Sequence, residues 1–512
     1  MSKIVGIDLG TTFSAIAILD DLGNPEVLAN PDTNSKITPS VVYIGKNDKV
    51  LVGDKAKDAA IAEPNRVAVE VKREMENEDV VFDPTKGIFV EGEKNSKNFT
   101  PSQISSLILS KLKDYTTGVK KAVITVPALF AERARTATID AAKLAGIEVL
   151  ELINEPTAAI LHYANLPGSS LSGRILVFDL GGGTFDVTIA KVQGKAVDVI
   201  TSRGDKHLGG TDFDREIVKL LSEKYKKEKG TGLNEKDKKN QDIAEKIKRI
   251  LSVKDKASDV VDGPKGPVKI EITRVQFEKA IKRYLEQIKM LMEDALESAD
   301  CTHEQIKQTL LVGGSTRVPC VVETIKKVMK KDPVKGVNVD EAVASGAAIY
   351  AGLLSKKDLN AAQKKSLDKI ELEDVCNHYL GTLVVAKDHE RNIHGVANKI
   401  IIERDTKLPC SKTVEVETLY DGQDVIECSV TQSEGPEKDK EFVTVIHQSN
   451  LDLPKGRPAG QPIKVTYSYD KSGTIHVEFL DVNSKKKYEA DLKPMGSQSI
   501  KELKKDLNFD IE

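Results

Sequence analysis

The feature that most constrains the fold of this chain is a short pattern that occurs twice. Residues 6–12 (GIDLGTT) and 178–184 (FDLGGGT) each run from an apolar stretch through Asp into a glycine-rich turn with Thr, and a second apolar stretch follows each turn. Glycine permits a tight turn between two strands, so each copy is typical of a β-hairpin. The two distant copies predict two similar lobes, each of which directs a hairpin into a shared cleft.

The residue types in this pattern suit a nucleotide and its metal. Glycines let backbone N–H groups approach phosphate oxygens, and Thr hydroxyls add further donors. The carboxylates of Asp8 and Asp179 would repel phosphate unless a cation lay between them, and Mg²⁺ is usually held partly through its waters. The P-loop pattern GxxxxGK[ST] does not occur in the sequence. The repeated pattern therefore predicts an ATP-driven protein with a phosphate site of another kind.

Composition excludes several classes of function. A chain of 512 residues predicts roughly two to four domains. The 76 basic and 79 acidic side chains leave a net charge of −3, which gives no basic surface for nucleic acid or for a membrane. The five cysteines form no CxxC pair and are expected to be inert thiols in a reducing compartment. We recognise neither a signal peptide nor an apolar window of ~18 residues, so we expect a cytoplasmic protein without a membrane span.

The pattern of apolar residues divides the chain into four parts. Residues 1–354 mix short apolar strands, such as 121–126 and 309–312, with helical stretches at 133–145 and 277–299, as an α/β domain should. Residues 355–375 are rich in charge and are predicted to be a linker. Residues 376–495 alternate apolar and polar residues, which predicts an antiparallel β-sandwich. Residues 496–512 carry apolar residues at helical spacing and are predicted to form a short helical tail.

Two further stretches suit a nucleotide in the cleft. A third glycine turn, residues 312–319 (VGGSTRVP), follows a strand and precedes a helix, which suits contact with a sugar or an α-phosphate. A polar stripe on a predicted helix suits an adenosine pocket, because it offers a carboxylate, a hydroxyl and long basic stems. The stripe consists of Glu245, Lys248, Arg249 and Ser252. Taken alone, it is more typical of a solvated helix face, and the glycine turn is as typical of an ordinary connection.

Acidic residues stand at the start of two stretches of small residues. Residues 154–159 (NEPTAA) and 340–348 (DEAVASGAA) are predicted helices whose small side chains let two helices cross closely, as a hinge between lobes requires. Taken alone, Glu155 and Asp340 are explained by the favourable helix dipole at an N-terminus. Lys72 alone is typical of an exposed lysine.

Together these stretches resemble the seventy-kilodalton heat-shock chaperone family. IDLGTTFS, VITVPALF, INEPTAA, FDLGGGTFDV, GDKHLGGTDFD, EKIKRILS, LLVGGSTRVP and DEAVASGAA are similar to motifs of its nucleotide domain, and GVANKI, DTKLP, GRPAGQPIKVTY and DKSGTIHV to motifs of its peptide-binding domain. The resemblance implies an α/β actin-like two-lobed ATPase domain, followed by an antiparallel β-sandwich peptide-binding domain. The family's C-terminal helical lid has no counterpart, from which we expect bound peptide to leave quickly.

The resemblance also implies roles for individual residues. Lys72 would orient the attacking water, and Pro127 and Arg135 match a switch between the nucleotide site and the peptide domain. Catalysis would rest on Lys72, Glu155, Asp8, Asp179 and Thr184. Hydrated Mg²⁺ would lie beside Asp8, Glu155 and Asp179, and K⁺ beside Asp8, Asp179 and Asp186. ATP or ADP would contact Gly10, Thr11, Thr12, Phe13, Gly181, Gly182, Gly183, Thr184, Glu245, Lys248, Arg249, Ser252, Gly313, Gly314, Ser315, Arg317 and Asp340.

The function implied is that of an ATP-dependent molecular chaperone. ATP hydrolysis would be coupled to the binding and release of extended hydrophobic segments of unfolded polypeptides, and bound peptide would accelerate hydrolysis because such coupling is reciprocal. A J-domain co-chaperone and a nucleotide exchange factor would be its partners.

The chain departs from the family pattern at three places. The family's linker is a run of leucines before Asp, whereas residues 370–375 (IELEDV) carry Glu371 and Glu373, which predicts poor docking of this strand and weakened interdomain coupling. Glu151 stands where the family has an Arg that meets the acidic J-domain, which predicts an altered J-domain partner or none. Residues 384–393 are expected to form an enlarged, charged loop at the peptide arch.

Two other functions stay open on the residues alone. A small-molecule kinase on the same fold would need a substrate pocket and a base for its hydroxyl, and the sequence indicates neither. A regulatory scaffold with a degenerate nucleotide site conflicts with the presence of Asp8, Lys72, Glu155 and Asp179.

Overall fold

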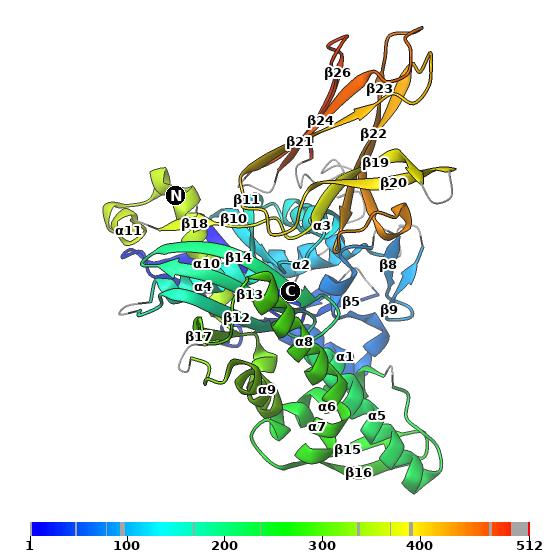
Figure 1. Cartoon of the computed structure of the whole chain (residues 1–512). Coiled ribbons are helices and arrows are strands. Elements are labelled where there is room, and N and C mark those ends of the chain that lie inside the picture. Colours follow the sequence, from blue (N-terminus) through cyan, green and yellow to red (C-terminus); the bar gives the residue numbers. More distant parts are fainter. Residues whose placement is uncertain are drawn as a thin grey trace.

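The structure is a computed structural model that describes residues 3–46, 49–77, 79–92, 98–166, 169–235, 237–334, 338–368, 370–388, 393–470, 474–492 and 510–511. Up to α10 (Ala342–Leu354) it mixes sheets and helices, and beyond the linker it consists mainly of antiparallel strands (Figure 1). This architecture is consistent with the expected actin-like ATPase followed by a β-sandwich. Among these residues, no helix is both long and apolar enough to cross a membrane.

Two sheets of similar pattern form the centre of the first part. In lobe I the order is β11 (Glu148–Asn154), β10 (Val119–Val126), β1 (Lys3–Asp8), β2 (Phe13–Leu19) and β3 (Pro25–Val27), and β4 (Thr38–Pro39) also pairs with β2. In lobe II it is β17 (Ile306–Val312), β12 (Gly173–Leu180), β13 (Phe185–Gln193), β14 (Ala196–Asp205) and β18 (Glu371–Glu373). β1 and β12 each pair in parallel with one neighbour and in antiparallel with the next strand of the chain. The two predicted hairpins are therefore confirmed.

Small residues allow α4 (Glu155–Ala164) and α10 to pack closely. A Cβ atom on Gly346 would lie 1.7 Å from the carbonyl oxygen of Ala158, and one on Gly6 would lie 2.1 Å from the amide nitrogen of Ala348. Both distances are far below van der Waals contact, so the backbones can approach only because these residues are glycines. The predicted close crossing of the two helices is confirmed.

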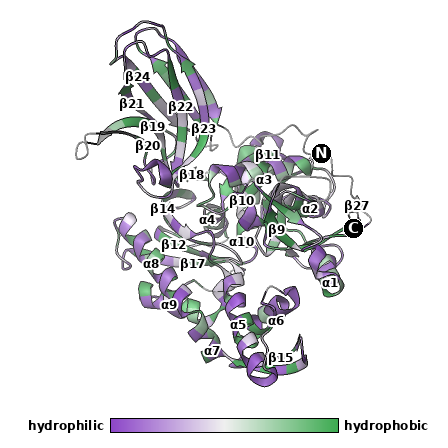
Figure 2. Ribbon diagram, turned by 90° about the vertical axis from the view of Figure 1, so that its right-hand side faces the viewer, coloured by the Kyte–Doolittle hydropathy of each residue, from purple (hydrophilic) through white to green (hydrophobic). Residues whose placement is uncertain are grey.

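Helices cover the outer part of lobe II. They are α5 (Gly210–Lys229), α6 (Lys238–Leu251), α7 (Arg274–Ala280), α8 (Lys282–Ser298) and α9 (Pro319–Met329), with a hairpin of β15 (Lys256–Gly263) and β16 (Gly266–Thr273) beside them. Hydrophilic and hydrophobic segments alternate along these helices, as expected where one helix face is buried (Figure 2). The prediction of one continuous helix over 277–299 is wrong, because the helical backbone is interrupted at Ile281, between α7 and α8. Ile281 is itself buried, so the apolar pattern runs through the break without marking it.

The rest of lobe I is built from short strands, turns and helices. These are β5 (Val42–Ile44), β6 (Lys49–Val52), α1 (Asp54–Ala62), β7 (Val67–Ala68), the 3₁₀ turn η2 (Val71–Glu74), the hairpin of β8 (Val80–Asp83) and β9 (Ile88–Glu91), α2 (Pro101–Lys113) and α3 (Glu132–Leu144). Val71 packs in the same core as Val5 and Ile7 of β1, so η2 belongs to lobe I. Asp510–Ile511 forms β27, which pairs in parallel with β6, so these two residues of the predicted helical tail are extended instead. The rest of that predicted tail lies outside the described residues.

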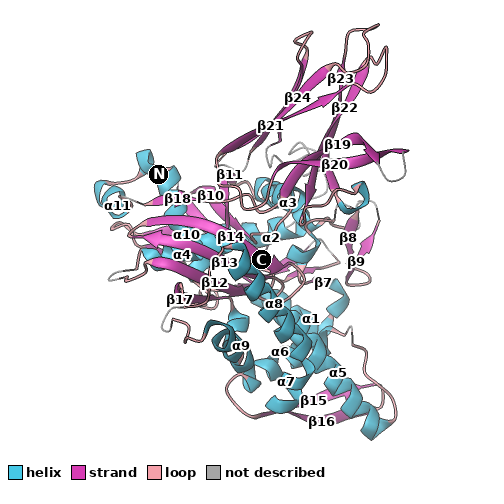
Figure 3. Ribbon diagram, viewed as in Figure 1, coloured by secondary structure: helices cyan, strands magenta, loops and turns pink. Residues whose placement is uncertain are grey.

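The part from Tyr379 to Leu492 contains two four-stranded antiparallel sheets (Figure 3). One has the order β20 (Ile393–Ile402), β19 (Tyr379–Asp388), β22 (Val425–Ser433) and β23 (Thr444–Asp452), and the other β21 (Cys410–Glu417), β24 (Pro462–Tyr469), β25 (Ile475–Asp481) and β26 (Lys487–Leu492). One hydrophobic core takes side chains from both sheets, such as Leu380, Val430, Val465 and Phe479. The expected arch loop is mostly strand, because β19 extends to Asp388 and β20 begins at Ile393; residues 389–392 lie outside the described part.

The predicted linker is docked, which overturns the expectation drawn from its glutamates. β18 pairs in parallel with β14, with Leu372 opposite Val197. Side chains alternate along a strand, so Leu372 is half-buried while Glu371 and Glu373 are exposed. The acidic residues therefore occupy the solvent-facing positions and do not prevent pairing. Earlier in the linker, η4 (Lys356–Asp358) and α11 (Ala361–Ser366) are helical.

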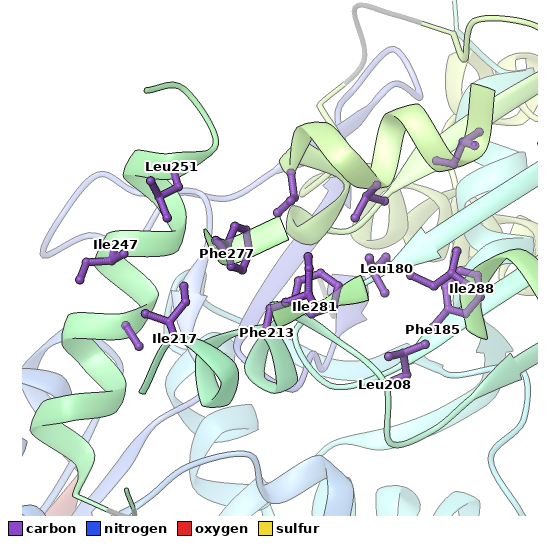
Figure 4. Close-up of a cluster of buried hydrophobic side chains, with 14 of the residues drawn as sticks. Leu180, Phe185, Leu208, Phe213, Ile217, Ile247, Leu251, Phe277, Ile281 and Ile288 are labelled. Atoms are coloured by element: carbon purple, nitrogen blue, oxygen red, sulfur yellow. The ribbon is translucent and has the colours of Figure 1, made fainter. Parts of the chain in front are cut away.

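A large hydrophobic cluster attaches α5 and α6 to the sheet of lobe II (Figure 4). Phe213 and Ile217 of α5 and Ile247 of α6 pack with Leu180 and Phe185, which flank the second glycine turn. Full burial of one such side chain contributes about 1.5–3 kcal/mol. The cluster therefore holds α5 and α6 in place beside the turn that carries the predicted phosphate contacts.

Candidate functional site

The two hairpin turns face a cavity of about 830 Å³ between the lobes. Side chains and backbone from both sheets, α6 and the third glycine turn line it. Of the residues that the sequence predicted for catalysis, metal and nucleotide, all but Gly183 and Asp186 line this cavity: Asp8, Gly10, Thr11, Thr12, Phe13, Lys72, Glu155, Asp179, Gly181, Gly182, Thr184, Glu245, Lys248, Arg249, Ser252, Gly313, Gly314, Ser315, Arg317 and Asp340.

The two turns touch each other across the cleft. A Cβ atom on Gly182 would lie 2.3 Å from Cγ2 of Thr12, and one on Gly183 would lie 2.5 Å from Cγ2 of Thr11. Glycine is therefore required at both positions by the facing threonines. The backbone N–H of Gly181 donates to the carbonyl of Thr184 at 3.1 Å and closes the second turn. This arrangement brings the donors of both turns to one place, as a phosphate chain requires.

Asp8, Glu155 and Asp179 line the cavity, and a fourth carboxyl group, that of Asp186, is buried beside them. Asp8 ends β1, and Asp179 and Asp186 are opposite each other in the β12–β13 hairpin. Burial, followed by the charge of Glu155, raises the pKa of Asp8 to about 7 and that of Asp186 to about 8, and the same causes raise the pKa of Asp179. Oδ1 of Asp186 is buried without a hydrogen-bond partner. Buried carboxyl groups that repel one another favour a cation among them.

These carboxyl groups fit a hydrated Mg²⁺ rather than a directly bound ion. In the described part of the chain, no three His, Cys, Asp or Glu side chains come close enough together to hold a metal directly. Mg²⁺ commonly keeps several waters and is bound through one or two carboxylates and substrate phosphates. Asp8, Glu155 and Asp179 would accept hydrogen bonds from such waters.

Lys72 and Glu155 form a buried ion pair. Lys72 lies in η2 of lobe I, and Glu155 is the first residue of α4. The Lys72 ammonium donates to Oε1 of Glu155, and its Nζ lies 5.7 Å from the centroid of the Phe130 ring. Lys72 is thus not the exposed lysine that it would be taken for in isolation. Its ammonium is held at the cavity, where it can orient a water or a phosphate oxygen.

The polar stripe of α6 lines the cavity, with Arg249 still largely exposed to solvent at its rim. Oε2 of Glu245 accepts from Nζ of Lys57 at 3.1 Å. Nζ of Lys248 donates to Oδ2 of Asp214 at 2.7 Å and to the carbonyl of Gly210 at 2.9 Å. The guanidinium of Arg249 lies 5.8 Å from the centroid of the Phe13 ring, so this pair joins α6 to lobe I at the cavity wall.

The third glycine turn completes the wall on the side of lobe II. Oγ of Ser315 donates to the carbonyl of Gly181 at 2.7 Å, which joins the third turn to the second. Arg317 forms a two-point ion pair with Asp340, with distances of 2.9 and 3.3 Å. The turn is therefore part of the site and not an ordinary connection.

Several residues of the site escaped the sequence-based prediction. Lys57 lies on α1 and has no motif around it. Arg73 donates to the carbonyl of Gly183 at 2.9 Å and to Oδ2 of Asp212 at 2.6 Å, and Arg215 donates to Oδ1 of Asp212 at 2.8 Å. The only sequence indication was the acidic pair within residues 211–214 (TDFD). These contacts link η2 of lobe I to the start of α5 in lobe II.

The predicted switch residue Arg135 and the linker meet next to Glu155. Nη2 of Arg135 donates to Oδ1 of Asn154 at 2.6 Å, and Nδ2 of Asn154 donates to Oδ2 of Asp374 at 3.1 Å. Pro127 lies in the turn between β10 and α3, where its carbonyl accepts from the N–H of Phe130 at 3.1 Å. Glu151 lies on β11 and accepts from the hydroxyl of Tyr350 at 2.7 Å.

A comparison with known protein families gives one match over nearly the whole chain. The sequence profile of the family described as Hsp70 protein matches residues 4–508. The matched range includes the cavity between the lobes, the linker and both sheets that follow it.

Proposed function

The chain belongs to the Hsp70 family, whose members are ATP-dependent chaperones, and from this premise we propose that it couples ATP hydrolysis to the binding and release of extended hydrophobic segments of unfolded polypeptides. Members of the family hydrolyse ATP and bind ATP or ADP with Mg²⁺. We propose residues 1–354 as the nucleotide-binding domain, 355–375 as the linker and 376–495 as the substrate-binding domain.

The cavity residues suit transfer of a phosphoryl group to water. Bound Mg²⁺ would supply the positive charge that offsets the phosphates. Lys72, held by Glu155, would orient the attacking water, and Thr11, Thr12, Thr184 and the glycine-turn N–H groups would hold the phosphate oxygens. The side chains around α6 and the third turn would hold the adenosine. Asp186 would join Asp8 and Asp179 in contacting K⁺.

One observation carries the proposed coupling: the linker is hydrogen-bonded beside the residue that holds Lys72. Oδ2 of Asp374 accepts from Asn154 at 3.1 Å and from the Thr157 hydroxyl at 3.3 Å. Asn154 is the N-cap of α4, and Glu155 is its first residue. A shift of the linker would therefore move Asn154 at the start of α4, and the next residue is Glu155, whose carboxylate positions the Lys72 ammonium.

The sheets beyond the linker make further contacts with lobe II. Arg203 of β14 donates to both carboxylate oxygens of Asp405, at 2.8 and 3.3 Å. Arg404 donates to the carbonyl of Ser202 at 2.5 Å, and Lys407 pairs with Asp198 at 2.8 Å. In lobe I, the N–H of Glu132 donates to Gln432. These contacts support a docked state that ATP would favour and that peptide would oppose, since a ligand shifts an equilibrium only through its different affinities for the two states.

Exposed apolar residues on β19 and β20 suit an extended hydrophobic peptide. Val385 and Val396 are exposed and are opposite each other in the register of the two strands. Main-chain hydrogen bonds and pockets for alternate side chains would hold such a peptide.

Family members also work with co-chaperones, and we propose a J-domain partner and a nucleotide exchange factor here. The carboxylate of Glu151 would repel an ordinary acidic J-domain. Stimulation of ATP turnover by an ordinary J-domain, lost in Glu151→Lys, would contradict this expectation.

The test is ATP turnover with and without an extended apolar peptide. We expect slow turnover that peptide raises, that Lys72→Ala abolishes, and whose response to peptide Asp374→Asn reduces. Asp368→Asn is the matched control, because Asp368 is an exposed carboxylate in the same linker. Turnover that requires a sugar or another acceptor would instead support a kinase, and failure to bind ATP would support a scaffold.

A further inference from the structure

A second cavity, of about 270 Å³, lies where the linker and the following sheets meet lobe I. α3 contributes Glu132 and Arg135, and β11 contributes Glu151. Asp374 of the linker and the next segment, with Asn377 and His378, form the opposite side. The nucleotide cavity shares none of these residues. The mechanism proposed above leaves this space without a role.

Three buried side chains at this cavity have hydrogen-bond acceptors without partners. They are Oε1 of Glu132, Oδ1 of Asn377 and Nε2 of His378. The three residues are 9%, 7% and 6% exposed. Burial, with the charge of Arg135 next, lowers the pKa of His378 to about 3, and its ring also hydrogen-bonds the backbone of Leu129, so the ring is neutral and Nε2 carries a lone pair. All three unpaired atoms therefore need a donor, and leaving such an atom unpaired costs about 1–3 kcal/mol.

At a pH above about 7, where Glu132 and Glu151 are ionised, the cavity also carries an excess of negative charge. Glu132, Glu151 and Asp374 line it, and none of the three forms an ion pair with a described residue. Two cations line it as well, Arg135 and the exposed Lys356. Among the described residues, Arg135 donates only to neutral groups, Asn154 and the carbonyl of Phe130, so its charge offsets part of the excess, and Lys356 is exposed to solvent. A carboxylate away from water is costly unless a cation or a donor compensates it.

We propose that this cavity binds a small organic cation with a primary ammonium group. The ammonium offers three N–H donors and a positive charge, which match the unpaired acceptors and the surplus carboxylates. Apolar side chains of Leu152, Ile370 and Leu408 line the rest of the cavity and suit a short alkyl chain. The volume lies at the small end of ligand sites. Water would satisfy the acceptors without balancing the charge.

Such a cation would stabilise the docked arrangement. The cavity exists only while α3 and β11 of lobe I, the linker and the following sheets are together. A ligand that binds one arrangement alone shifts the population towards it. The site is thus distinct from the nucleotide site and acts on the contact between the two parts of the chain.

The test is calorimetric titration of the full-length protein with butylamine, with butanol and KCl as matched probes. It is done at about pH 8, above the pKa of about 7 that burial gives to both Glu132 and Glu151. We expect saturable binding of one butylamine, no binding of butanol, and no competition by KCl at equal ionic strength.

Substitutions locate the binding. We expect Glu132→Gln and Glu151→Gln each to weaken butylamine at least tenfold, and Glu148→Gln, an exposed change on the same strand as Glu151, to leave it unchanged. Thermal unfolding midpoints establish that each variant is folded. If one of the two cavity variants does not fold, the other one alone tests the proposal. No binding, equal binding of butanol, displacement by KCl, or equal affinity in all variants would overturn the proposal.

Discussion

Replacement of Arg73 by Ala should accelerate nucleotide release. Arg73 is attached to lobe I through η2, and it donates to the Gly183 carbonyl and to Asp212 in lobe II. The side chains of Arg73 and Asp212 are 7% and 8% exposed. The neighbouring pair of Arg215 with Glu70 also joins the lobes, but these side chains are 47% and 21% exposed. Of these two contacts, opening of the cleft would break one that is buried and one that is exposed. The pairs Lys57–Glu245 and Lys206–Glu76 also join the lobes, and both are partly exposed.

The free-energy cost of Arg73→Ala depends on which hydrogen-bond partners Asp212 keeps in the variant. Hydrogen bonds to charged groups contribute about 1.5–3 kcal/mol, and a broken buried pair costs more when the remaining charge has no partner. Asp212 keeps two donors in the variant, the guanidinium of Arg215 at 2.8 Å and the N–H of Gly209 at 2.8 Å. We therefore take the lower part of the range, about 2 kcal/mol, which corresponds to roughly 30-fold in the rate of release at about 1.4 kcal/mol per tenfold.

Release of a fluorescent ADP analogue, followed by stopped flow, measures this effect. We expect roughly 30-fold faster release from Arg73→Ala, and less than about fivefold from Arg215→Ala, because exposed ion pairs contribute about 0–1 kcal/mol. Arg73→Lys keeps the positive charge but loses the planar guanidinium that donates to both Gly183 and Asp212. Its rate of release should therefore lie between those of the two alanine variants. The argument that burial decides the strength of this contact would be refuted if Arg73→Ala released the analogue at the wild-type rate, or if both alanine variants accelerated release equally.

Three further predictions concern docking and stability. Burial raises the pKa of Glu132 and Glu151 from 4.5 to about 7 in the docked state, so these two residues bind more protons in that state and docking should strengthen as the pH falls from about 8 to about 6. The lowered pKa of His378 at the same contact opposes this trend, so the double Gln variant should lose the strengthening. Energy transfer between dyes on lobe I and β26 measures the docking. Tyr467→Phe removes a buried hydroxyl whose single proton is shared between the carbonyls of Gly381 and Ser429, at 2.9 and 3.0 Å. Urea unfolding should show a loss of about 1–3 kcal/mol, and an unchanged free energy of unfolding would contradict this. Gly346→Ala places a methyl group against the carbonyl of Ala158 and should lower stability by about 1–3 kcal/mol or more; an unchanged unfolding midpoint would mean that α4 and α10 can separate freely.

The sequence alone determined the parts of the site that depend on local chemistry. A glycine turn between two short apolar runs is typical of a hairpin, so the positions of Asp8 and Asp179 at the two turns followed from residues a few places apart. The polar stripe of α6 followed from helical spacing in the same way, although only its partners decide whether it faces solvent or a cavity.

The tertiary structure decided everything that depends on residues distant in the sequence. Glu371 and Glu373 were expected to weaken docking, yet the pairing of β18 with β14 turns them to solvent and Leu372 inward. The contact of Arg73 with Asp212 and the charged cavity beside Asp374 likewise join segments with no shared motif. The physical reason is that a side chain's pKa, exposure and partners depend on burial and on charges within a few ångströms, and folding alone brings those neighbours together.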